Sequence, residues 1–254
     1  MTRARPCPRK TPEELSREWD RLAPERHRQI LSHEDLSFDH VVVPTALRLL
    51  EEVGASTVVD VGAGTGEFTR QLAHFARKVV AIEPSAASMR VARRVCQAVD
   101  NIVYVESTLE DSVARLVEER PAAATAVMVL MAAPDLGAFA RALAEILPAG
   151  AKFVAVLIHP CFWPKYWAYD EESWFRYEVE TFIEAPFSIS RHATGIVTTH
   201  IHRPLGHYLD AFAAEGFRLD HLIEPVPPPE VQALYPAPWR FPRFLGLRWL
   251  RWHK

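Results

Sequence analysis

The stretch VVDVGAGTGEFT, residues 58–69, constrains the fold more than any other part of the sequence. A short β-branched run from Thr57 to Val61 enters a loop with three glycines, and residues 67–75 then carry apolar side chains at helical spacing. Glycines let a backbone turn sharply and approach a ligand closely, because they lack the Cβ that resists such conformations. The segment therefore predicts a strand, a tight turn and a helix, with a nucleotide-like cofactor held at the turn.

Strand and helix patterns alternate along most of the chain. The segments with strand patterns are residues 57–61, 78–82, 101–106, 125–131, 152–158, 217–223 and 244–252. Helical patterns separate most of these segments. The alternation predicts an α/β fold, a doubly wound and mostly parallel sheet of seven strands with right-handed crossovers.

The N-terminal part follows a different pattern. Residues 1–10 are rich in Pro and Arg and are predicted to form a disordered tail. Residues 11–254 are predicted to form a single domain, whose first part, residues 11–45, is a helical cap. The sequence TPEE has the composition of a helix start, and this helix is expected to end at about Leu22.

Residues 159–203 interrupt the alternation after the fifth strand. This segment is rich in Trp, Tyr and Phe, and it ends in two alternating stretches, residues 187–190 and 196–202, that predict a hairpin. It follows the carboxyl end of a strand, the edge at which open parallel sheets bind ligands. We therefore predict a lid that shapes an apolar pocket suited to an aromatic molecule.

The composition excludes several classes of protein. An apolar fraction of 49%, with no apolar run long enough to span a bilayer, is typical of a globular protein outside the membrane. A formal charge of -3 gives no general attraction to nucleic acid. Three scattered cysteines fit neither a disulfide framework nor a zinc cluster, and no other residues have the spacing of a metal site. We expect a cytoplasmic monomer or homodimer with reduced thiols and no metal.

The loop residues narrow the choice of cofactor. A dinucleotide loop has the pattern G-x-G-x-x-G/A, which requires Gly or Ala where this chain has Glu67. The pattern here is D-x-G-x-G-x-G, beginning at Asp60. An acid at that strand end repels a pyrophosphate but suits a ligand with an ammonium and a sulfonium group, which favours S-adenosylmethionine. Glu83, at the end of the next strand, is placed to accept hydrogen bonds from ribose hydroxyls, and both kinds of cofactor carry a ribose.

With these residues the sequence resembles the class I S-adenosylmethionine-dependent methyltransferases, over nearly the whole chain from about Thr11. The resemblance depends on the glycine motif together with VVAIEPS, with ESTLED after the third strand, with the PAG that precedes the fifth strand, and with two late strands. It implies a Rossmann-like methyltransferase fold in which the last strand is antiparallel and lies between the fifth and sixth. It also implies S-adenosylmethionine as cofactor and S-adenosylhomocysteine as product.

The resemblance further assigns roles to individual residues. Trp19 in the cap closes over the cofactor, residues 108–110 flank the adenine, and Met131 lies near the methionine end. The complete set of predicted cofactor-binding residues is Trp19, Asp60, Gly62, Ala63, Gly64, Gly66, Glu83, Pro84, Thr108, Leu109, Glu110 and Met131.

Histidines are the candidates for a catalytic base. His159 follows the fifth strand, and His200 and His202 point the same way along one strand of the predicted hairpin. A histidine can take a proton from an acceptor near neutral pH. His159 is the first choice, because strand ends at this edge face the cofactor.

The predicted activity is methyl transfer from S-adenosylmethionine to an O, N or C atom of a small, aromatic or apolar metabolite. The Arg-heavy, Ala-rich composition and the long insertion resemble enzymes of secondary metabolism. Two alternatives stay open at this point. One is a protein that binds S-adenosylmethionine without methylating, such as a pericyclase-like catalyst or a regulatory partner. The other is a nicotinamide enzyme.

Overall fold

The structure is a computed structural model, and it describes residues 4–51, 56–189 and 193–252. Its centre is a seven-stranded sheet with the strand order β4-β3-β2-β5-β6-β10-β9. The strands are β2 (Thr57–Val61), β3 (Lys78–Ile82), β4 (Ile102–Val105), β5 (Ala123–Val127), β6 (Lys152–Ile158), β9 (Phe217–Ile223) and β10 (Phe244–Arg251). The pairs among β2 to β6 are parallel, whereas β10 lies antiparallel between β6 and β9. The predicted sheet, including its antiparallel last strand, is confirmed.

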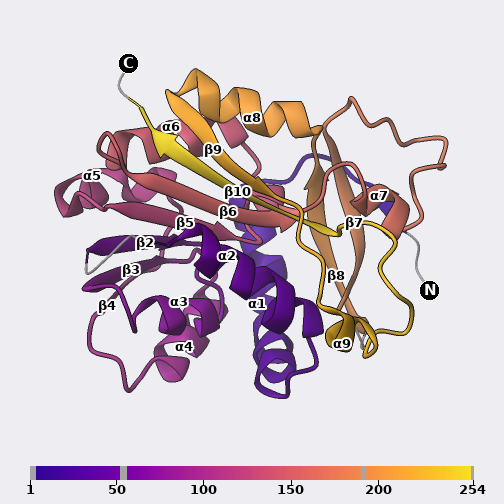
Figure 1. The fold of residues 1–254 in the computed structure, drawn as a ribbon, viewed down its shortest axis with the longest axis horizontal. Helices are drawn as coiled ribbons and strands as arrows, with labels where there is room; N and C mark the ends of the chain where they lie inside the picture. The colour runs from indigo at the N-terminus through magenta and orange to yellow at the C-terminus, as the bar shows by residue number, and fades with distance from the viewer. Residues whose placement is uncertain (1–3, 52–55, 190–192, 253–254) are drawn as a thin grey trace.

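Helices cover both faces of this sheet (Figure 1). On one face lie α2 (Val43–Leu49), α3 (Glu67–Leu72) and α4 (Ala86–Val95), and on the other lie α5 (Val113–Leu116), α6 (Leu136–Ile146) and α8 (Leu205–Ala214). Short helical segments are η1 (Phe38–Val42), η2 (Glu110–Ser112), η3 (Val117–Glu119), η4 (Leu130–Ala132), α7 (Trp163–Tyr166) and α9 (Pro229–Gln232). The central strands are buried on both faces, as the nearly continuous apolar sequence of strands such as KFVAVLI requires.

Helix α1 (Pro12–Leu31) forms the N-terminal cap and is longer than predicted. It begins in a capping box, in which Thr11 accepts a hydrogen bond from the Glu14 amide while the Glu14 side chain accepts one from the Thr11 amide. The expected end near Leu22 is wrong, because the helix continues through Pro24. Leu22 and Ile30 are buried on either side of this proline, and such packing compensates for the backbone hydrogen bond that Pro24 cannot donate.

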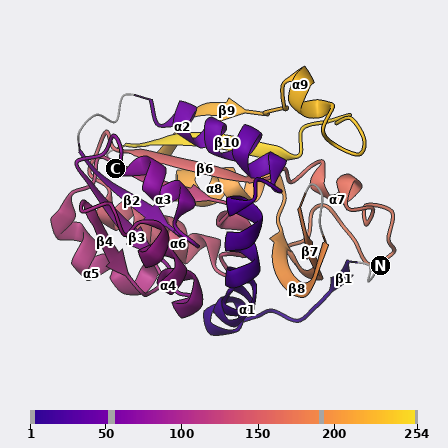
Figure 2. The same cartoon turned by 90° about the horizontal axis from the view of Figure 1, so that it is seen from below.

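The insertion of residues 159–203 carries a second, smaller sheet, visible beside α1 in Figures 1 and 2. Strands β7 (Thr181–Ser188) and β8 (Ala193–His202) form the predicted hairpin, although both begin earlier than the sequence indicates. A third strand, β1 (Arg5–Pro6), pairs antiparallel with β7. The prediction of a disordered tail is therefore wrong for residues 4–10, because β1 satisfies its backbone hydrogen bonds along the edge of the hairpin. Residues 1–3 lie outside the described residues.

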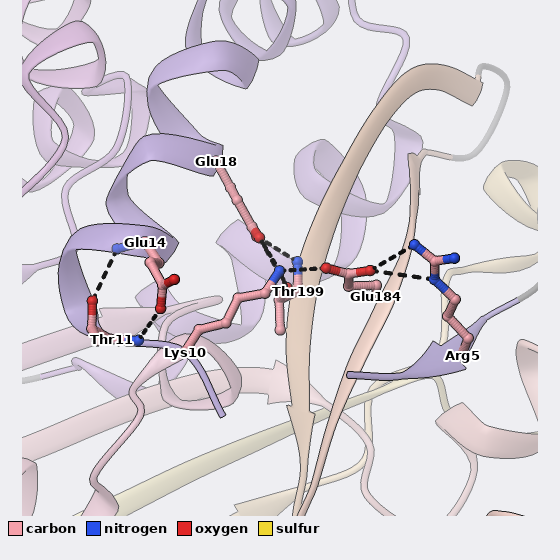
Figure 3. A network of polar contacts seen from close by, with 7 residues as sticks. All are labelled: Arg5, Lys10, Thr11, Glu14, Glu18, Glu184 and Thr199. Carbon is pink, nitrogen blue, oxygen red and sulfur yellow. Dashed lines mark hydrogen bonds and ion pairs between the residues drawn. The ribbon is translucent and has the colours of Figure 1, made fainter. Parts of the chain in front are cut away.

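A polar network joins this N-terminal segment to the cap and to the hairpin (Figure 3). The Lys10 ammonium donates to Glu18 on α1 at 2.6 Å, to Glu184 on β7 at 2.6 Å and to Thr199 on β8 at 2.8 Å. The Glu18 carboxylate also accepts the Thr199 amide at 2.7 Å. Glu18 is only 5% exposed, so its charge is compensated by these donors rather than by water. The network fixes the hairpin against α1.

Candidate active site

The glycine loop connects β2 to α3 through three residues with left-handed backbone angles, Gly62, Gly64 and Gly66. At Gly66 a Cβ would lie 2.8 Å from the Cα of Ala92 on α4. At Gly62 it would lie 2.4 Å from a methyl carbon of Val129. Glycine at these two positions thus permits both the turn and the close packing of the loop against its neighbours. Gly66 serves this packing and does not line the cavity described below.

Asp60 supports the loop from within the sheet. Its carboxylate is 2% exposed and accepts hydrogen bonds from Thr69 Oγ1 at 2.6 Å and from Thr125 Oγ1 at 2.7 Å. Burial raises the pKa of Asp60 to about 6, and the two hydroxyl donors oppose this shift. Asp60 also contributes to the cavity wall. The structure therefore gives this residue a supporting role in addition to the one that the sequence predicts toward a ligand ammonium.

Glu83, at the end of β3, faces the loop. Its Oε2 accepts the Gly64 amide at 2.9 Å and its Oε1 accepts the Ser85 amide at 2.7 Å. Burial raises the pKa of Glu83 to about 7, against the effect of the two amide donors. A carboxylate has about four acceptor positions, so two remain after these bonds. They match the two hydroxyls of a ribose.

These residues line a cavity of about 510 Å³, within the range of small-molecule sites. Its wall is formed by α1, the glycine loop, the end of β3, residues 107–111 and residues 127–139. Ten of the twelve residues predicted to bind the cofactor contribute to it: Trp19, Asp60, Gly62, Ala63, Gly64, Glu83, Pro84, Thr108, Leu109 and Glu110. Of the other two, Gly66 packs on α4, and Met131 lines a second cavity.

Two contacts that the sequence did not predict hold α1 over this cavity. Asp20 accepts hydrogen bonds from Ser85 Oγ at 2.7 Å and from the Ala87 amide at 2.9 Å, at the first turn of α4. His27 Nδ1 donates to Glu67 Oε1 at 2.8 Å. Each pair joins residues 40 or more positions apart, so no local pattern in the sequence indicates it. In the sequence, Glu67 indicates only that the loop does not match a dinucleotide-binding motif. In the structure it also anchors the cap through His27.

A second cavity, of about 140 Å³, adjoins the first beneath the insertion. The two cavities share the wall residues Trp19, Arg26, Phe38, Met128 and Ala132. Other parts of the second wall come from α7, from the 187–189 and 198–200 segments of the hairpin and from the start of β10. The ring of Trp19 meets that of Phe187 edge-on at 6.1 Å, which connects the cap to the hairpin above this boundary.

Met128 is a boundary residue that the sequence analysis missed. The predicted fourth strand, residues 125–131, ends at Val127 because Met128 adopts a φ of +61°. Non-glycine residues rarely occupy this region, and when they do they often lie at functional sites. The turn places Met128 in the walls of both cavities.

Of the three candidate histidines, only His200 lines the second cavity. His159 is 2% exposed, its Nε2 donates to Glu224 at 2.8 Å, and its Nδ1 accepts the Cys161 amide at 3.2 Å. His202 is 4% exposed and donates from Nε2 to the Tyr177 carbonyl at 2.9 Å. The structure does not bring these two to either cavity, and their ring hydrogen bonds join loops of the fold. His159, the first choice from the sequence, is therefore not placed to act as the base.

His200 is a neutral polar group that lies among aromatic side chains. Its Nε2 lies 3.2 Å from the hydroxyl of the buried Tyr169, and its ring meets Trp167 edge-on at 5.5 Å. Burial lowers the pKa of His200 to about 3, and the neighbouring His202 adds to this effect. Burial also raises the pKa of Tyr169, so that both groups are uncharged at neutral pH.

Among the described residues, no group of three or more His, Cys, Asp or Glu side chains is arranged to hold a metal ion. The helices of the described ranges include none long and apolar enough to cross a membrane.

A mostly parallel sheet with a glycine loop and a buried acid, Glu83, at the carboxyl edge of its parallel strands is typical of nucleotide-cofactor enzymes of the doubly wound class. Residues 8–222 match the model of a family described as the methyltransferase domain, and the chain belongs to this family. The expected enzyme, a class I methyltransferase with S-adenosylmethionine as cofactor, is thereby confirmed.

Solved structures share the fold. An S-adenosylmethionine-dependent methyltransferase from Mesorhizobium loti is 24% identical with a TM-score of 0.59, and the match covers 82% of this chain and 96% of that one. A 1,6-didemethyltoxoflavin-N1-methyltransferase from Burkholderia thailandensis, solved with 1,6-didemethyltoxoflavin and S-adenosylhomocysteine, is 13% identical with a TM-score of 0.61, covering 98% and 95%. No curated protein is significantly similar in sequence to the chain.

Proposed function

We propose that the protein methylates an O, N or C atom of a small aromatic or apolar metabolite bound in the second cavity, which we call the acceptor cavity. The observation that carries this proposal is the shared wall, in which Trp19 and Met128 separate a cofactor-sized cavity from a smaller one lined with aromatic rings. The Burkholderia thailandensis neighbour was solved with 1,6-didemethyltoxoflavin and S-adenosylhomocysteine bound, which supports a small-molecule acceptor here.

The residues of the first cavity fit S-adenosylmethionine, with the ribose on Glu83 and the adenine flanked by residues 108–110. The bound cofactor supplies an electrophilic methyl group. The task of the protein is then to hold the acceptor atom at attacking distance and to exclude water. The cap performs the exclusion, because Asp20 and His27 fasten α1 across the cavity.

We propose that His200 is the general base that removes a proton from the acceptor. The imidazole is neutral at physiological pH and lies in the acceptor cavity with Tyr169 as its hydrogen-bond partner. When Nε2–H donates to the Tyr169 hydroxyl, Nδ1 is the acceptor nitrogen of the neutral ring, and it can accept a hydrogen bond from a hydroxyl, amine or enol and take up the proton as the acceptor atom bonds to the methyl carbon. An imidazole whose free-enzyme pKa is near 3 is a weak base, so we expect it to serve acidic acceptors best.

The proposed methyl transfer is tested by a turnover assay. Purified protein is incubated with S-adenosylmethionine and a panel of phenols, amines and enols, and S-adenosylhomocysteine is quantified. We expect release of S-adenosylhomocysteine that depends on the acceptor. Tight binding of S-adenosylhomocysteine without turnover on any compound of the panel would favour the non-methylating alternative. The cytoplasmic location and a role in secondary metabolism are part of the proposal and are tested by localisation and by the identity of the accepted compound.

A further inference from the structure

Arg243, the residue before β10, brings a positive charge to the acceptor cavity. Its guanidinium carbon lies 3.9 Å from the ring centre of Tyr166, 4.4 Å from that of Trp239 and 5.5 Å from that of Tyr235. Tyr166 lines the same cavity. The guanidinium is therefore held among aromatic faces at the cavity wall, where cation–π attraction fixes its position.

This charge has no carboxylate partner within residues 4–51, 56–189 and 193–252, since no hydrogen bond or ion pair there joins the guanidinium to an acid. The other arginine of the cavity, Arg26, differs in this respect, because it donates to Asp35 at 2.7 Å. Burial lowers the pKa of Arg243, and the phenols of Tyr166 and Tyr235 oppose this shift. The Arg26 and Asp35 charges compensate one another, which leaves the cavity with an excess positive charge at Arg243.

A purely structural role would use the guanidinium for ring stacking alone. A cation–π contact with a ring face, however, is not a hydrogen bond to an oxygen acceptor, which the five N–H donors of a guanidinium can also make. A partly buried cation with free donors is stabilised by an anion that can accept two parallel hydrogen bonds. A planar carboxylate is such an anion, because its two oxygens match a pair of parallel N–H donors of the guanidinium.

We propose that the methyl acceptor is an aromatic carboxylic acid and that Arg243 binds its carboxylate. The aromatic ring of the acceptor then packs among the side chains of the insertion. This proposal rests on the proposed function, because it takes the second cavity as the acceptor site. Arg243 then determines specificity, since it distinguishes an acid from the corresponding neutral amide.

The proposal is tested by calorimetry on protein saturated with S-adenosylhomocysteine. The probes are benzoate, 4-hydroxybenzoate and indole-3-carboxylate, each compared with its primary amide. The wild-type protein should bind at least one acid about tenfold or more tightly than its amide. In Arg243→Gln the acid should bind roughly tenfold to a hundredfold more weakly while the amide is unaffected, and Arg243→Lys should keep part of the preference.

The control variant is Arg240→Gln, three residues away and exposed, which should bind the acid as the wild type does. The affinity for S-adenosylhomocysteine, measured first in every variant, verifies folding. Failure of the wild type to bind S-adenosylhomocysteine would contradict the proposed function. If S-adenosylhomocysteine binds but acids and amides bind equally, if no acid binds, or if Arg243→Gln keeps the preference, the proposal on Arg243 is overturned and the proposed function is not.

Discussion

The two cavities are built from different kinds of contact. The first cavity, which we propose holds the cofactor and call the cofactor cavity, depends on backbone, with Gly62 and Gly64 in left-handed conformations at its wall and a carboxylate that accepts the amides of Gly64 and Ser85. The acceptor cavity depends on side chains that come from α1, α7, the hairpin and β10. A wall made of backbone changes little when side chains change, whereas a wall of side chains can be altered one residue at a time. The comparison explains how one fold keeps its methyl donor while its acceptors vary.

The largest expected effect is at Gly66, which packs the glycine loop against α4 without lining the cavity itself. In Gly66→Ala the new methyl group would meet the Ala92 backbone at 2.8 Å in a left-handed conformation, so we expect the free energy of unfolding to fall by about 3 kcal/mol. The affinity for S-adenosylhomocysteine should fall with it. Gly150→Ala is the matched control, since Gly150 also has a left-handed φ but a Cβ there has nothing within 4 Å, and urea denaturation should detect a smaller loss. Equal losses in both variants would show that close packing at Gly66 is unimportant.

The second effect is a pH dependence from Glu83. Its pKa is about 7 in the folded protein, against 4.5 for an unperturbed glutamate, so the folded state holds the proton more tightly than the unfolded chain does. The stabilisation is fully present below pH 4.5, is lost as the pH rises to 7, and amounts to about 3 kcal/mol. In the absence of cofactor, Glu83→Gln should remove this part of the pH dependence of the free energy of unfolding. A difference between variant and wild type that is constant from pH 4.5 to 7 would contradict the assignment.

At the side-chain wall, His200→Gln should lower the rate of methyl transfer about a hundredfold while leaving the affinity for S-adenosylhomocysteine unchanged. His202→Gln is the comparison, because His202 lies two residues away on the same strand but outside the cavity. It should reduce thermal stability, through the lost bond to the Tyr177 carbonyl, more than it reduces the rate of folded enzyme. Unaltered turnover in His200→Gln would remove this histidine from the mechanism.

The smallest effects concern the network that joins the cap to the hairpin (Figure 3). Lys10→Met leaves the buried carboxylate of Glu18 without its cation and should lower the free energy of unfolding by roughly 2 kcal/mol. Arg5→Gln removes an ion pair to Glu184 whose arginine is 68% exposed, and it should cost less than about 1 kcal/mol. Denaturation of both variants measures the difference. A larger loss at Arg5 would mean that the outer ion pair, and not the buried one, holds the hairpin.

The part of the site that binds the methyl donor could be predicted from the sequence, because the residues that form it lie close together in the chain. Spacing and residue type within VVDVGAGTGEFT and VVAIEPS define the loop and its acids. The acceptor side and the cap contacts depend on residues far apart in the chain, such as Asp20 with Ser85 and β1 with β7. His159 and His200 show what sequence patterns cannot predict. Both follow or lie on strands near the same edge, but hydrogen bonds to Glu224 and Cys161 draw His159 into the fold, and no pattern in the sequence reveals those partners.

The central claim is that donor and acceptor meet across the wall formed by Trp19 and Met128. A crystal structure with S-adenosylhomocysteine tests it most directly. We predict that the ribose hydroxyls contact the Glu83 carboxylate and that the sulfur lies at the shared wall, open toward His200 in the acceptor cavity. A sulfur that faces away from the acceptor cavity, or a nucleoside bound beneath the hairpin, would contradict the account.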